Sequence, residues 1–291
     1  MGIINFFKTK VMCPEINDIL QAYKAKLRLQ RYAPSSIKTY ANALAKFLIA
    51  FSRHDLTKVD LVQIEHFMQQ LQQKQAISAP YQKQILASIG KFYQLFYQRK
   101  LDLVALYPKR LAKPLPKYLT PTEVKRLLEH CTNQKHLSIL QLLYGCGLRV
   151  SEVVALKIED INSDAMRILI RDPKGKKDRV VPLPRKLLHN LRLYYRAYRP
   201  KKFLFEGQTG GVYSVKSIQN FIKKYASNAQ LTKRVFPHML RHSYATHQLE
   251  NGVNIRYVQT LLGHKSIKTT ELYTHVAEIS KGNILSPLDQ L

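Results

Sequence analysis

The residues best suited to chemistry lie between positions 237 and 273. His238 and Arg241 are three positions apart and follow Pro237, which suits the first turn of a helix because its missing N–H is not needed there. This spacing places both side chains on one face of a helix, near the end where free backbone N–H groups point outward. A fixed cation, a titratable imidazole and free amides together form a receptor for a phosphate group.

Two more candidate side chains follow in the same stretch. A short helix predicted over residues 254–262 ends at Gly263 and exposes His264, and a helix predicted over residues 267–276 carries Tyr273. The stretch therefore predicts a phosphate site with a tyrosine delivered to it.

Each candidate, taken alone, also has a purely structural explanation. Arg149 follows Gly147-Leu148 at a predicted loop–helix junction, where it can pair with Glu152. Lys174 lies in a predicted hairpin turn, where charged residues are common, and a single histidine is more often structural than catalytic. Tyr273 is one of 17 tyrosines, most of which belong to a core. It is the combination of these residues that argues for a functional site.

The net charge predicts a polyanionic partner. The chain has 291 residues, with 47 Lys+Arg against 19 Asp+Glu, which gives +28. Residues 1–112 hold 17 basic and 6 acidic side chains (+11), which leaves 30 and 13 (+17) for the remainder, so both parts are basic. Such an excess favours nucleic acid over an anionic membrane, and no apolar run approaches the length of a membrane span.

The three cysteines and the first residues bear on the compartment. Cys13, Cys131 and Cys146 are unrelated in spacing, as expected for reduced thiols in a cytoplasmic protein and not for a disulfide framework or a structural zinc site. The first twelve residues place an apolar patch before the lysines, which is the wrong order for a secretory signal.

The elements that must position the candidates fall into two predicted domains. Residues 14–106 predict an all-α bundle of about four amphipathic helices, with Ser35-Ser36 capping the second and Asp60 preceding the third. Residues 107–117 form a basic linker with three prolines. Residues 118–277 predict a mixed α+β, mainly helical domain with a small antiparallel sheet, whose strands span 166–171 and 179–182. Residues 278–291 form a C-terminal tail, for which we expect packing on a neighbouring protomer or a frayed end.

The motifs, in this order and at these spacings, resemble the tyrosine recombinase (phage integrase) family, with Xer-like and mobile-element integrases nearest. The resemblance covers essentially the whole chain and is carried by the motifs Gly147-Leu148-Arg149-Val150-Ser151-Glu152, His238-x-Leu240-Arg241-His242, Leu262-Gly263-His264 and Tyr273-Thr274-His275. It implies that the helical domain is a core-binding, SAM-like DNA-binding domain and that the second domain is catalytic.

The resemblance also implies a role for each motif residue. Tyr273 would attack the phosphorus of a scissile DNA phosphate and give a 3′-phosphotyrosine and a free 5′-hydroxyl. Arg149 and Arg241 would bind the non-bridging oxygens of that phosphate, because guanidinium forks match this geometry. A phenol with a pKa near ~10 needs help to lose its proton, and His238 is the candidate base.

Four further assignments follow. Lys174 would be the general acid for the leaving 5′-oxygen, with Lys176 and Lys177 close enough in sequence that only alignment to the family favours Lys174. His264 would hydrogen-bond the phosphate, while Glu152 and His242 would orient the other residues. The basic residues that we expect to lie along DNA are Lys38, Lys83, Lys91, Arg99, Lys109, Arg110, Lys113, Lys176 and Lys177.

The implied partner is double-stranded DNA with inverted-repeat core sites, bound by four protomers on two sites. A paralogue or accessory proteins can also be needed, and no membrane is expected. The reaction conserves bond energy and the arginines do the electrostatic work of a metal, so no cofactor or metal is expected. The alternatives are a type IB topoisomerase and a DNA-binding relative without catalysis. Integration, excision, inversion and dimer resolution all remain open, and the protein is expected in the cytoplasm, with the nucleoid.

Overall fold

The chain divides into two compact units, residues 1–113 and 114–291. The computed structural model describes residues 14–109, 116–171 and 178–281, with the backbone alone for residues 275–281. Each unit has its own hydrophobic core. None of the helices in these described ranges is long and apolar enough to cross a membrane.

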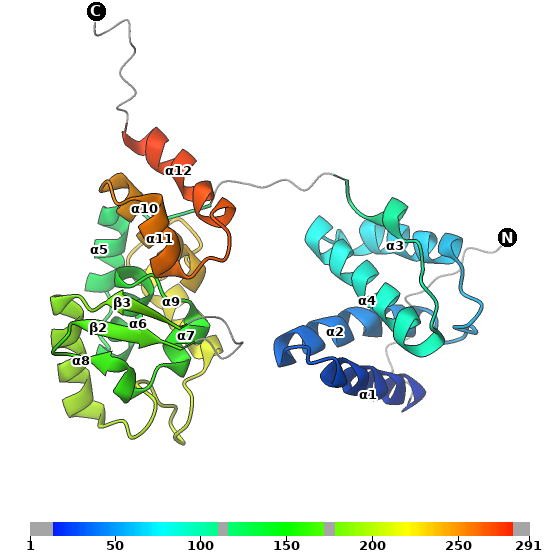
Figure 1. Ribbon diagram of the computed structural model, residues 1–291, viewed down its shortest axis with the longest axis horizontal. Helices are drawn as coiled ribbons and strands as arrows, with labels where there is room; N and C mark the ends of the chain where they lie inside the picture. Colours follow the sequence, from blue (N-terminus) through cyan, green and yellow to red (C-terminus); the bar gives the residue numbers. More distant parts are fainter. Residues whose placement is uncertain (1–13, 110–115, 172–177, 282–291) are drawn as a thin grey trace, which may run out of the picture. The chain divides into compact units, whose positions relative to one another are not determined.

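The N-terminal unit is the helical bundle that the sequence predicts (Figure 1). Its core is aromatic: the rings of Phe47, Phe67 and Tyr93 are fully buried and meet edge to face. Asp60 caps the third helix by accepting the Gln63 N–H at 2.8 Å. The helices are α1 (Pro14–Leu29), α2 (Pro34–Ala50), α3 (Leu61–Gln75) and α4 (Ala79–Tyr97).

The predicted cap of α2 at Ser35-Ser36 is wrong. The helix already begins at Pro34, and Ala33 is its N-cap, with an extended backbone and no side-chain hydrogen bond. Proline supports this earlier start because its φ is fixed near the helical value and its missing N–H leaves one fewer donor to satisfy.

The C-terminal unit surrounds a three-stranded antiparallel sheet with helices. The sheet order is β1-β2-β3, and buried Ile168 of β2 pairs with Val181 of β3. The sequence predicted two of the three strands, because β1 is only two residues long and has no alternation of its own to detect. The strands are β1 (Ile161–Asn162), β2 (Arg167–Ile170) and β3 (Arg179–Pro182), and the helices are α5 (Pro121–Glu129), α6 (Gln134–Gly145), α7 (Val150–Ala155), α8 (Arg185–Tyr198), α9 (Val215–Asn228), α10 (Pro237–Glu250), α11 (Ile255–Leu262) and α12 (Lys268–Lys281).

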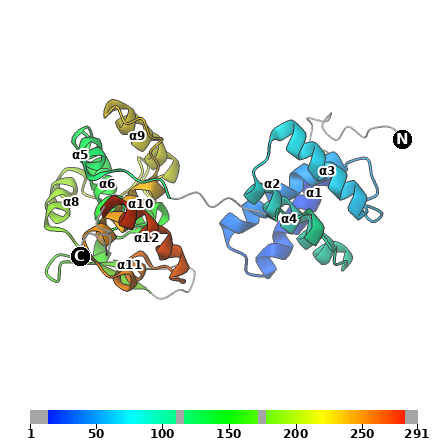
Figure 2. The ribbon, with the colours of Figure 1, turned by 90° about the horizontal axis from the view of Figure 1, so that it is seen from above.

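Helix α10 is central to the C-terminal unit. It packs on α6, α11 and α12. Helices α10, α11 and α12 gather at one end of the unit (Figures 1 and 2). Fully buried Ser243 on α10 accepts the backbone N–H of Leu119 at 2.9 Å and thereby fixes the chain just before α5. The predicted fold class, a helical bundle followed by a mainly helical α+β domain with a small sheet, is confirmed.

Candidate active site

The turn between α6 and α7 places Arg149 at the start of a helix. Gly147 has a left-handed backbone (φ +61°), and Leu148 beside it is fully buried. Arg149 is then the N-cap of α7, and the Glu152 carboxylate accepts both its backbone N–H (2.8 Å) and its guanidinium Nη1 (2.7 Å). The spacing of three residues makes this contact local, as the sequence predicted.

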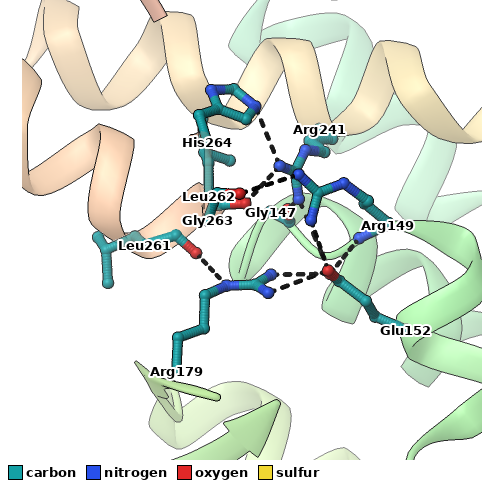
Figure 3. A network of polar contacts seen from close by, with 9 residues as sticks. All are labelled: Gly147, Arg149, Glu152, Arg179, Arg241, Leu261, Leu262, Gly263 and His264. Carbon is teal, nitrogen blue, oxygen red and sulfur yellow. Dashed lines mark hydrogen bonds and ion pairs between the residues drawn. The ribbon is translucent and has the colours of Figure 1, made fainter. Parts of the chain in front are cut away.

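The C-terminal end of α11 holds three arginines. The successive carbonyls of Leu261, Leu262 and Gly263 accept hydrogen bonds from Arg179 Nε (2.8 Å), Arg241 Nη2 (2.6 Å) and Arg149 Nη2 (3.2 Å), respectively (Figure 3). The last carbonyls of a helix have no partner within it and form the negative end of its dipole. Gly263 in the left-handed conformation (φ +63°) ends the helix there.

Glu152 lies at the centre of this cluster. Its two oxygens accept Nη1 and Nη2 of Arg179 at 2.9 and 2.7 Å, and Arg241 Nη1 lies 3.8 Å from Oε2. Burial alone would raise the pKa of Glu152, but the hydrogen bonds and charge of Arg179, and then the contacts with Arg149, outweigh it and lower the pKa to about 2. Three guanidiniums against one carboxylate leave a local excess of two positive charges.

His264 follows this helix end and is neutral. Its Nε2 lies 3.1 Å from Arg241 Nη2, and its Nδ1 lies 3.0 Å from the Thr270 hydroxyl. Burial, followed by the charges of Arg241 and Arg149, lowers the pKa of His264 to about 3. Because a guanidinium can only donate, Nε2 is the acceptor and Nδ1 carries the proton.

Tyr273 on α12 points into the same region. Its side chain is 3% exposed, its ring lies 6.4 Å from that of His264, and its hydroxyl is 2.7 Å from Nδ1 of His242. Burial raises the pKa of Tyr273, while the charges of Arg241 and Arg149 oppose this rise. Burial, and then the charges of His238 and Arg241, lowers the pKa of His242 to about 4, so at neutral pH this imidazole is uncharged.

The two histidines of α10 occupy different environments. His238 is exposed on the first turn of the helix, and its ring lies 6.1 Å from that of His242 one turn further on. His242, predicted only to orient other residues, is the one that the structure places against the phenol. The assignment of His238 as base stays a prediction.

The structure thus brings most of the predicted catalytic set together. Lys174, Lys176 and Lys177 lie outside the described residues. Arg179 was missed. A detectable signal existed, since Arg179 shares its side of β3 with buried Val181 two residues on, which places the arginine on the inward face.

The DNA-contacting roles of the basic residues in the N-terminal unit stay predictions. Lys38 lines a hollow with Lys24, Arg28 and Tyr32, and Lys91 lies 5.8 Å from the ring of that tyrosine. Arg99 donates to the backbone carbonyls of Thr57 and Val59, so it holds the fold together. Lys83 and Lys109 are exposed, and Arg110 and Lys113 lie outside the described residues.

Family comparisons match both units. The model of the N-terminal SAM-like domain of phage integrases matches residues 19–103, and that of the phage integrase family matches residues 117–279. The chain belongs to the phage integrase family of tyrosine recombinases. It is 32% identical to a tyrosine recombinase of Pseudothermotoga lettingae, over 94% of this chain and 98% of the relative. It is 34% identical to the tyrosine recombinase XerA of Pyrococcus horikoshii, over 89% of this chain and 90% of the relative.

Solved structures agree with the fold of this recombinase. The pre-cleavage complex of the XerH site-specific recombinase with its difH substrate has a TM-score of 0.70 at 22% identity, covering 96% of this chain and 91% of that one. A lambda integrase fragment bound to a core site has a TM-score of 0.71 at 15% identity, covering 93% and 97%. The protein is therefore a tyrosine-type site-specific recombinase, an enzyme that cleaves and rejoins DNA strands through a tyrosine-linked intermediate.

Proposed function

We propose that Tyr273 is the nucleophile of this recombinase. The observation that supports this role is the position of its hydroxyl, which is buried and hydrogen-bonds to His242. The charges of Arg241 and Arg149 nearby favour the phenolate. Attack on a scissile phosphate forms the bond from the tyrosine oxygen to phosphorus, and the 5′-oxygen of the next nucleotide leaves. The product is a 3′-phosphotyrosine and a free 5′-hydroxyl.

Arg149 and Arg241 bind the non-bridging oxygens of that phosphate in this proposal. Burial and the nearby Arg149 lower the pKa of Arg241 to about 9, so the site holds like charges close together while Arg241 remains protonated at neutral pH. An anion with two accessible oxygens relieves this repulsion, and more so when its negative charge grows in the transition state. His264, whose Nε2 accepts from Arg241 in this structure, would donate an Nε2–H to the same phosphate once that nitrogen carries the proton.

Two histidines are candidates for the base that takes the phenol proton. The 2.7 Å hydrogen bond favours His242, whose lowered pKa keeps it free to accept a proton at neutral pH. His238, exposed beside it, retains the role of base that the family resemblance implies, and its place on the first turn of α10 also suits binding of the phosphate. Lys174 is proposed as the general acid for the 5′-oxygen, with Lys176 and Lys177 as alternatives.

Double-stranded DNA with inverted-repeat core sites is the proposed substrate. The charge of +28 and the DNA complexes of the XerH and lambda integrase structures support it. Residues 14–106 would bind the core site, residues 107–117 would link the domains and residues 118–277 would carry out catalysis. Four protomers would act on two sites, with residues 278–291 contacting a neighbour and with a paralogue or accessory proteins where needed. The protein would act in the cytoplasm, on the nucleoid.

Covalent trapping tests the nucleophile. A nicked suicide duplex carrying the candidate site from the source genome is mixed with wild type or with Tyr273→Phe. Wild type should give an adduct that survives denaturant, and the variant should bind the duplex equally in a gel-shift assay but form no adduct. An adduct that persists in Tyr273→Phe would overturn the assignment. Relaxation of supercoils without strand exchange between partners would instead indicate the topoisomerase alternative.

The same assay separates the histidines. If His242 is the base, His242→Ala should slow adduct formation by on the order of 10²–10⁴-fold, the usual contribution of a general base. His238→Ala should then affect DNA affinity more than the rate constant of cleavage at saturating DNA. The reverse pattern would assign the base to His238.

A further inference from the structure

Arg179 is a third arginine in the cluster, and the roles proposed above do not include it. It is the first residue of β3 and its side chain is only 11% exposed. Figure 3 shows its guanidinium directed at the Glu152 carboxylate. Its three hydrogen bonds reach two other elements, since Nη1 and Nη2 bind Glu152 on α7 and Nε binds the carbonyl of Leu261 on α11.

The contact with Glu152 has an electrostatic consequence for the other two arginines. Both carboxylate oxygens are engaged by Arg179 in a two-pronged pair, the strongest common geometry for these groups. Without Arg179, the full negative charge of Glu152 would face only Arg149 at 2.7 Å and Arg241 at 3.8 Å. The carboxylate would then offset the charge that these two arginines present to a phosphate.

The contact with α11 has a geometric consequence. Leu261, whose carbonyl Arg179 binds, directly precedes Leu262 and Gly263, whose carbonyls orient Arg241 and Arg149. The stem of Arg179 also packs closely on Gly263, where an added Cβ would lie 3.2 Å from Arg179 Cδ. Arg179 therefore fixes the helix end that aligns both other guanidiniums.

We propose that Arg179 is a positioning residue for the phosphate site. It acts through Glu152, whose charge it neutralises, and through the end of α11, which it holds against β3. It touches neither the phosphate nor the nucleophile. This inference rests on the proposed phosphate-binding roles of Arg149 and Arg241.

A double-mutant cycle tests the proposal. Single-turnover cleavage of the nicked suicide duplex is measured at saturating DNA for wild type, Arg179→Met, Glu152→Gln and the double variant. Arg179→Met should slow cleavage by on the order of 100-fold, in the range seen when one charged group of a preorganised site is lost. In the Glu152→Gln background, the fold reduction in cleavage rate caused by Arg179→Met should be smaller by a factor of at least ~10. The amide no longer carries a charge that needs a partner. An equal loss in both backgrounds would overturn the action through Glu152, and no loss in either background would overturn the proposal as a whole.

Matched controls keep the test independent of folding. Arg192→Met removes an exposed arginine of α8, and it should leave the cleavage rate within ~2-fold of wild type. Arg179→Lys retains the charge without the two-pronged contact, and it should fall between wild type and Arg179→Met. If Arg179→Met fails to fold, as judged by circular dichroism, the double-mutant cycle is measured with Arg179→Lys in its place, combined with Glu152→Gln.

The outcomes separate this proposal from the proposed function. If wild type gives no adduct, or if Tyr273→Phe still gives one, the assignment of Tyr273 fails before Arg179 is considered. If wild type gives the adduct and Arg179→Met forms it equally fast, only the role of Arg179 fails.

Discussion

Gly147→Ala should destabilise the C-terminal unit through a single close approach. Gly147 has a left-handed backbone (φ +61°), and a Cβ at this position would overlap the Tyr244 ring and lie 3.0 Å from Leu262 Cδ2. The left-handed conformation costs a non-glycine residue about 1–2 kcal/mol. Overpacking against a buried ring adds about 1–3 kcal/mol. Together the free energy of unfolding should fall by roughly 2–5 kcal/mol.

The matched control is Gly252→Ala at the end of α10. Gly252 is also left-handed (φ +83°), but its added Cβ would meet nothing within 4 Å, so only the backbone cost of about 1–2 kcal/mol applies. Urea unfolding followed by circular dichroism measures both variants. In a thermal melt, 2–5 kcal/mol corresponds to a fall of about 4–20 °C for a unit of this size. Equal destabilisation by the two substitutions would show that the Tyr244 contact does not constrain this turn.

Gly147→Ala should also affect catalysis. The Gly147 carbonyl accepts Arg241 Nη1 at 2.7 Å, so a shift of this turn moves the acceptor that orients the guanidinium. Molecules of the variant that remain folded should therefore form the covalent adduct more slowly than wild type, whereas Gly252→Ala should not differ from wild type. A normal rate in folded Gly147→Ala would mean that the Leu262 carbonyl alone suffices to orient Arg241.

Two further predictions concern stability. The pKa of Glu152 is lowered to about 2, so the folded state binds fewer protons than the unfolded state in acid, and roughly 3 kcal/mol of stability present above pH ~5 should be lost as the pH falls towards 2. Urea unfolding at a series of pH values measures this loss, and an unchanged pH dependence in Glu152→Gln would refute it. Ser243→Ala removes the partner of the buried Leu119 N–H and should lower the free energy of unfolding by about 1–3 kcal/mol. Ser227→Ala, on an exposed face of α9, should lower it by less than ~0.5 kcal/mol. Equal effects of the two substitutions in urea unfolding would mean that the Ser243 hydrogen bond does not stabilise the fold.

Local interactions made much of this protein predictable from its sequence. Asp60 starts α3 with a capping box, and Gly263 ends α11 in the left-handed conformation, at positions where the sequence indicated helix boundaries. The pairing of Arg149 with Glu152 belongs to the same class, since both residues lie within one helical turn. Such contacts depend on spacing along the chain and on backbone geometry, which the sequence specifies directly.

The boundaries that the sequence misplaced show where local rules give several answers. Near Pro34, both the serines and the proline favour a helix start, and the proline determined it. Strand β1 exists because Ile161 and Asn162 pair with Ile168 and Arg167 of β2. A strand of two residues has no periodicity of its own, so only its partner defines it.

The sequence by itself determined the residue types of the site, the helices that carry them and the basic character of both units. Only the tertiary structure decided which of them meet. Arg179 lies 27 residues from Glu152 and 82 from Leu261, and His242 rather than His238 hydrogen-bonds Tyr273, 31 residues away. These contacts between residues far apart in the sequence are set by how α7, α10, α11, α12 and β3 pack. That packing depends on the whole core at once. Spacing along the chain identifies candidates, and close packing selects the partners.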